Sequence, residues 1–160
     1  MKETFQTPSS QNQRISHREI LQAAVNLTDF AELYRQKVLT QQTRTIRLLG
    51  KKNPARIMHT LLGFEVQACR KRIHCPDMVT ARYIRLFSEL GCRSIKLPYD
   101  PTRTAQLIPE FEAMLDRIAL QIQERFSGDR QTRRYVIRRV YAIIRGQLRS
   151  AQHSGTALFK

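Results

Sequence analysis

The side chains with the most reactive chemistry in this chain lie in one stretch, CRKRIHCPDMVTARYIRLFSELGC. It runs from Cys69 to Cys92 and holds all three cysteines of the chain and one of its four histidines. Thiolate and imidazole are zinc ligands, and a thiol held beside a histidine is a nucleophile. The stretch therefore leaves three sites to consider: a metal centre, a catalytic cysteine, and a helix-turn-helix that reads DNA.

The spacing of the cysteines does not favour a metal centre. Structural zinc sites take their ligands in close pairs such as C-x2-C and H-x3-H, and neither pair occurs in the chain. Cys69 falls on a predicted apolar stripe, where a free cysteine packs as a small hydrophobic residue. Cys75 and Cys92 flank a predicted helix, and His74 is a cation in the last turn of another. We expect these residues to be scaffold, with no metal and no cofactor.

A catalytic cysteine has equally weak support. Cys75 precedes Pro76 and Asp77 near a predicted helix N-terminus, which can lower the pKa of a thiol. No histidine stands at a spacing that would place it beside this thiol, although His59 and His74 are available. The chain also lacks a glycine-rich phosphate loop, H-E-x-x-H and G-x-S-x-G. We therefore expect a protein that is not an enzyme.

Residues 54–90 are compatible with a helix-turn-helix in which two helices are joined by the turn HCPD. The second helix would present Arg82 and Arg85 to bases or phosphates. An acid at the start of that helix, Asp77, is unfavourable next to phosphate, and the turn lacks its usual glycine. An ordinary helical hairpin with Arg82 and Arg85 on a solvated face remains the alternative.

The elements that would position these residues are all predicted to be helical. Apolar residues recur at three- and four-residue spacing, and no long segment alternates with period two. The pattern predicts an all-α fold, a single compact bundle of about five helices. The predicted organisation is a disordered N-terminal arm over 1–14, a helical domain over 15–150 and a frayed tail over 151–160. A capping box, Ser16 and Glu19, opens the first helix.

The segment 54–74 is predicted to be the central and most buried helix. Asn53 is a good N-cap, and Pro54 suits the first helical position. Two neighbouring apolar stripes run along it, made of Leu62, Val66, Cys69 and Ile73 and of Ile57, Leu61, Phe64 and Ala68. Two prolines interrupt residues 94–101, which leaves room for a very short strand with no sheet to join.

Net charge is the strongest indicator of a partner. The chain has 28 Lys and Arg against 13 Asp and Glu, a formal net charge of +15. Such a chain binds polyanions by releasing their counterions, which favours nucleic acid over an acidic protein and over an anionic membrane. No apolar run is long enough to span a membrane, and the first residues do not form a secretory signal. We therefore expect a cytoplasmic protein with no membrane partner.

The last predicted helix carries the clearest basic face. Residues 130–149 contain seven arginines and no acid. At 100° per residue, four of these arginines fall within about 60° of arc, opposite the apolar residues. They are Arg134, Arg138, Arg145 and Arg149. The preceding helix is acidic, so pairing of some arginines with Glu110, Glu112, Asp116 and Glu124 is the alternative interpretation.

A second basic region precedes the predicted central helix. Its cations include Arg44, Arg47, Lys51 and Lys52, and no acid lies between Leu33 and Phe64. Together the two regions predict a small basic nucleic-acid-binding protein, regulatory in role, that contacts phosphates of DNA or RNA through its last helix. The alternative is a helical adaptor or assembly factor that docks an acidic protein on the same face. The oligomeric state stays open.

Overall fold

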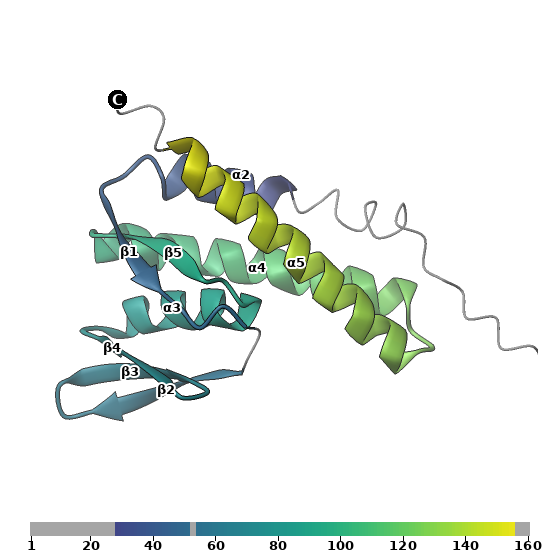
Figure 1. Ribbon diagram of the computed structural model, residues 1–160, viewed down its shortest axis with the longest axis horizontal. Helices are drawn as coiled ribbons and strands as arrows, with labels where there is room; N and C mark the ends of the chain where they lie inside the picture. The colour runs from purple at the N-terminus through teal and green to yellow at the C-terminus, as the bar shows by residue number, and fades with distance from the viewer. Residues whose placement is uncertain (1–27, 52–53, 156–160) are drawn as a thin grey trace, which may run out of the picture.

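The computed structural model describes residues 28–51 and 54–155, and within them the chain forms four helices and five strands (Figure 1). Their order is α2 (Thr28–Lys37), β1 (Thr43–Arg47), β2 (Ala55–Thr60), β3 (Gly63–Ala68), β4 (Lys71–Cys75), α3 (Met78–Leu90), β5 (Ser94–Pro98), α4 (Pro101–Arg125) and α5 (Arg130–Gly155). The expected all-α bundle is therefore wrong: the fold is α+β. The predicted arm at 1–14 and the Ser16–Glu19 capping box lie outside the described residues.

The predicted central helix at 54–74 is instead a three-stranded antiparallel sheet, β2-β3-β4. Val66 faces Ile57 on one neighbouring strand and Ile73 on the other, so all three side chains lie on the inner face. Cys69, expected on a buried stripe, is exposed in the turn between β3 and β4 with a φ of 55°. Because this segment is not a helix, the proposed helix-turn-helix has no first helix.

The very short strand anticipated within residues 94–101 exists, and it has a partner. β5 pairs antiparallel with β1, and Ile95 lies opposite Ile46. The sequence of β1, TRTIR, has one apolar residue, which is why its pattern resembles a loosened helix more than a strand. The pairing brings the segment after α2 against the segment after α3.

Helix α3, between Cys75 and Cys92, and helix α5, which begins at Arg130, lie where the sequence predicts them. The side chain of Asp77 accepts a hydrogen bond from the Thr80 amide and caps α3, which ends at Gly91 in the left-handed conformation (φ 82°). Asp100 caps α4, and its side chain accepts a hydrogen bond from the Thr102 amide at 2.9 Å. Helix α5 continues to Gly155, so part of the predicted frayed tail is helical.

The core lies between the three-stranded sheet and the long helices. Helix α3 packs on that sheet with one face and on α4 with the other (Figure 1). Phe87 of α3 is the centre of an aromatic cluster, with ring centroids 4.8 Å from Tyr83, 5.6 Å from Phe111, 5.8 Å from Tyr34 and 6.2 Å from Phe30. All five rings are buried. The cluster joins α2, α3 and α4 into one unit.

The outer edge of β5 is bonded by side chains of the helices around it. The Lys96 amide donates to the hydroxyl of Tyr34 (2.7 Å), and the Lys96 carbonyl accepts from the hydroxyl of Tyr83 (2.9 Å). The side-chain amide of Gln152, on α5, donates to the Tyr34 hydroxyl at 3.0 Å and to the Ser94 carbonyl at 3.3 Å. These bonds satisfy backbone groups that a free strand edge would present to another strand.

Candidate nucleic-acid interface

Helix α5 is held by a narrow apolar seam that turns its arginines outward. The seam consists of four side chains at four-residue spacing, each no more than 2% exposed: Val136, Val140, Ile144 and Leu148. The four predicted arginines lie along one flank of this seam, and two of them, Arg145 and Arg149, line a hollow together with Leu148 of the seam. Arg134, Arg138 and Arg149 are exposed, and Arg145 is half-buried. We call this set, Arg134, Arg138, Arg145 and Arg149, the arginine ridge.

The arginines of α5 are not neutralised by the acidic helix beside them. Among residues 28–51 and 54–155, none of the seven forms a salt bridge with a carboxylate. Two of the four acids of α4 bind other helices: Glu110 binds Lys37 of α2, and Glu112 binds Arg82 of α3, each at 3.1 Å. The alternative interpretation, in which α4 pairs with α5, is therefore not what the fold produces.

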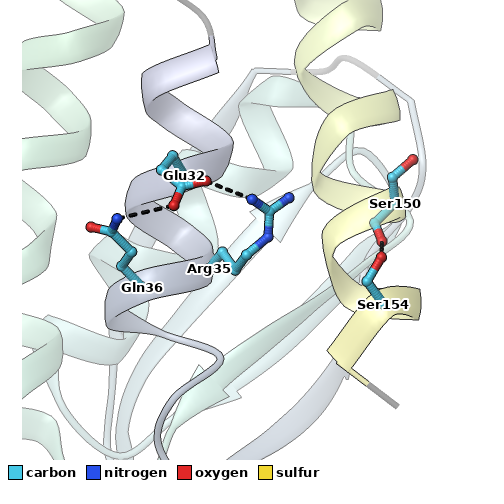
Figure 2. A network of polar contacts seen from close by, with 5 residues as sticks. All are labelled: Glu32, Arg35, Gln36, Ser150 and Ser154. Atoms are coloured by element: carbon cyan, nitrogen blue, oxygen red, sulfur yellow. Dashed lines mark hydrogen bonds and ion pairs between the residues drawn. The ribbon is translucent and has the colours of Figure 1, made fainter. Parts of the chain in front are cut away.

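Cations on the other helices are largely ion-paired. On α2, the carboxylate of Glu32 accepts hydrogen bonds from Arg35 and Gln36 (Figure 2). The same view shows the neighbouring α5, where the Ser154 hydroxyl donates to the Ser150 carbonyl. On α3, Arg85 binds Glu89. Both candidates of the helix-turn-helix hypothesis, Arg82 and Arg85, thus have carboxylate partners. Unpaired positive charge accumulates on α5.

Two ridge residues join a third arginine around a small hollow. It has a volume of about 40 Å³ and is lined by Cys92, Arg93, Ser94, Arg145, Leu148, Arg149 and Gln152. No carboxylate belongs to its lining. A water molecule needs about 10–15 Å³ by this measure, so the hollow has room for a few groups of the size of water. We call this site the arginine cleft (Arg93, Arg145 and Arg149).

One arginine of the cleft also has a structural contact. Arg145 donates from Nη1 to the carbonyl of Leu90 at 2.8 Å, at the end of α3. Carbonyls in the last turn of a helix have no partner within it, and a guanidinium there also interacts favourably with the helix dipole. Burial raises the pKa of the Cys92 thiol to about 12, and the charges of Arg145 and Arg149 oppose that rise. Both charges therefore lie close to the base of the cleft.

The structure does not bring the cations of the second predicted basic region together in one place. Arg47 is exposed and lies opposite Ser94, next to Arg93 of the cleft. Arg93 in turn packs against the turn that precedes Lys51, because a Cβ on Gly50 (φ +78°) would approach its Cγ to 2.6 Å. Arg44 lies at the other end of β1, on the opposite face of the strand from Arg47. Lys52 falls outside the described residues.

Sequence reasoning did not identify Arg93. It stands alone in a turn after Gly91 and Cys92, with no periodic pattern around it. Its position depends on the pairing of β1 with β5, in which the Leu48 amide donates to the Arg93 carbonyl at 2.7 Å. A prediction that β5 pairs with β1 would have placed Arg93 beside the second basic region.

The cysteines and histidines do not assemble a reactive site. Across the ranges that the structure describes, no three or more His, Cys, Asp or Glu residues come together as metal ligands. Burial raises the pKa of the Cys75 thiol to about 11, the reverse of the lowering that a nucleophile needs. His59 contacts Phe64 edge to face, with ring centroids 4.5 Å apart and an interplanar angle of 60°.

In comparisons with known proteins, no family model, no curated protein and no solved structure matches this chain. The helices in the described ranges also include none with the length and apolar character required to cross a membrane.

Proposed function

We propose that the protein binds nucleic acid, and that α5 contacts the phosphate backbone through the arginine ridge and the arginine cleft. The observation that carries the proposal is the absence of salt bridges to the arginines of α5, within the part of the chain described, while two acids of α4, Glu110 and Glu112, bind α2 and α3. A solvated face whose only role is solubility ordinarily mixes both signs of charge.

The dimensions of the ridge suit a polyanion. Arg134 and Arg149 are fifteen residues apart, which is about 22 Å along a helix axis at 1.5 Å per residue. This length corresponds to roughly six base pairs of duplex at 3.4 Å per step. Arginine also presents a planar fork that binds two oxygens of one phosphate, which lysine cannot do.

The test is a salt titration of binding to duplex DNA and to single-stranded RNA, followed by fluorescence anisotropy. A triple variant, Arg134→Gln, Arg138→Gln and Arg149→Gln, leaves the structural contact of Arg145 in place. The log–log salt slope should become shallower by about 0.9 per lost duplex contact, or about 2.7 for three, and by about 0.7 per contact on a single strand. Glutamine retains helix propensity, so the melting temperature should not change.

The matched control is Arg82→Gln with Arg85→Gln, which removes two arginines that are bound to carboxylates. This control should leave the salt slope nearly unchanged. If the control and the ridge variant alter binding equally, general charge and not the ridge carries the affinity. Binding that is absent for both nucleic acids at low salt would refute the proposal, and capture of a nuclease-resistant acidic protein would then favour the adaptor.

A further inference from the structure

The tip of the β2–β3 hairpin exposes two large apolar side chains. Leu61 and Leu62 form its two-residue connection and are 105% and 84% exposed, whereas the exposed leucine of α4, Leu120, is 54% exposed. Two-residue hairpin connections ordinarily use Asn, Asp or Gly. Single exposed leucines are common on protein surfaces, but an adjacent pair at a projecting turn indicates a contact with a partner.

The tip is held in place by the segment beneath it. Gly63 has a φ of +131°, and a Cβ at this position would approach the Cys75 carbonyl oxygen to 2.9 Å. The hairpin end is thus seated directly on the β4–α3 connection. The Leu62 amide also bonds the Thr60 hydroxyl at 3.3 Å. The two leucines are therefore presented to solvent from a braced turn.

The outer face of the same sheet is basic at its other end. Arg56 and Arg72 both face Gln67 of the central strand, on the side opposite the buried Val66. Arg70 and Lys71 lie at the adjoining turn. The single carboxylate of this face, Glu65, lies 3.8 Å from Arg72, whose side chain remains 71% exposed and therefore weakly neutralised.

From this arrangement we infer that the outer face of β2-β3-β4 lies along a groove of duplex DNA and that Leu61 and Leu62 wedge between base pairs at its end. The inference rests on the proposed nucleic-acid function and narrows it to bent duplex. Strands enter DNA grooves, and apolar wedges that unstack a base step kink the duplex by about 20–90°.

The spacing along the hairpin matches this mode of binding. Arg56 precedes Leu61 by five residues, about 17 Å at 3.4 Å per residue of strand. The cations would therefore contact phosphates about five base pairs from the kinked step. A tip that enters a bilayer is favoured by Lys or Arg at its rim, whose charged ends reach the level of the headgroups. The residues flanking the leucines, His59, Thr60, Gly63 and Phe64, include neither.

The experiment measures DNA bending by energy transfer between dyes at the two ends of a duplex of about 30 base pairs. The native protein should raise the transfer efficiency on binding. The variant Leu61→Ser with Leu62→Ser should abolish that rise while it keeps the native salt slope and melting temperature. Leu120→Ser is the control, because it removes an exposed leucine outside the sheet and should bend DNA like the native protein.

The outcomes separate this inference from the function on which it rests. Binding without a rise in transfer, or an equal rise for the double variant, overturns the wedge and leaves the ridge experiment untouched. If the double variant bends DNA normally but no longer sediments with vesicles that contain anionic lipid, the tip is a membrane contact and the wedge is wrong. If the native protein does not bind duplex at low salt, the wedge is wrong, and the proposed function fails with it only if single-stranded RNA is not bound either.

Discussion

Arg145 is expected to differ from the rest of the arginine ridge in its effect on stability. Its guanidinium donates to the Leu90 carbonyl at 2.8 Å, while Arg149, one turn further along α5, is exposed and has no such acceptor among the residues that the structure describes. The change Arg145→Met removes the donor and keeps an unbranched apolar stem of similar helix propensity. Arg149→Met is its matched control.

The size of the effect follows from the type of bond. A hydrogen bond that involves a charged group contributes about 1.5–3 kcal/mol, and the half-buried position of Arg145 favours the lower half of this range. The loss also leaves a carbonyl at the end of α3 without a partner. We expect the free energy of unfolding to fall by about 1.5–2 kcal/mol, which lowers the melting temperature of a chain of this size by roughly 3–8 °C.

Urea denaturation followed by circular dichroism gives the measurement. At a slope of about 2 kcal/mol per molar, the midpoint for Arg145→Met should fall by about 0.8–1 M with the slope unchanged. Arg149→Met should shift the midpoint by no more than about 0.25 M, the equivalent of the 0.5 kcal/mol typical of a surface change. Equal midpoints for the two variants would refute the structural role of Arg145 and make all four ridge residues equivalent.

Three further predictions concern the glycines, the thiols and the aromatic cluster. Gly63→Ala should lower the melting temperature, because φ is +131° and the added carbon would lie 2.9 Å from the Cys75 carbonyl oxygen. Gly146→Ala, which has open space around it on α5, should instead raise the free energy of unfolding by about 0.5–1 kcal/mol. Calorimetry that ranks the two variants the other way would contradict the backbone assignment. Burial raises the pKa of the Cys75 thiol to about 11 and that of the Cys92 thiol to about 12, from 9.0, so the unfolded state loses these protons at a lower pH than the folded state. The free energy of unfolding should therefore fall between pH 9 and pH 12 and stay level below pH 8. Urea midpoints that rise between pH 9 and pH 12 would contradict this expectation. Phe87→Ala should cost about 3–5 kcal/mol by the same denaturation assay, because the ring is fully buried among four others, and a loss under 1 kcal/mol would show that the cluster is not the core.

The three-stranded sheet could not be recognised from the spacing of its apolar residues, because the short strands and their turns produce spacings that also fit a helix. Phe64 and Ala68 are four residues apart, as on one face of a helix, but they are also two steps of a strand with Val66 between them. Val66 and Ile73 are seven apart, which equals two helical turns, yet they are cross-strand partners. Leu61 and Leu62, predicted in the two buried stripes, are the turn itself. No strand here exceeds six residues, so alternation never extends far enough to dominate.

The candidate interface was more predictable where it depends on one helix. A 26-residue helix with apolar residues every fourth position fixes the direction of its other side chains, so the outward placement of Arg134, Arg138 and Arg149 follows from local periodicity alone. The cleft depends on tertiary contacts. Arg93 reaches it through the pairing of β1 with β5, and Arg145 is partly occupied by the end of α3. Neither of these two contacts can be predicted from local periodicity.

The bonds along the outer edge of β5 make one backbone amide a reporter of the whole assembly. The Lys96 amide donates to a hydroxyl of α2, that hydroxyl accepts from Gln152 of α5, and the Lys96 carbonyl is bonded by α3. If α2 leaves its position, the Lys96 amide loses its acceptor although β5 keeps its pairing with β1. Hydrogen exchange at Lys96 would then follow the free energy of releasing α2, while the Leu97 and Ile95 amides follow that of the strand pair. A single residue could in this way distinguish partial opening of the helical layer from global unfolding.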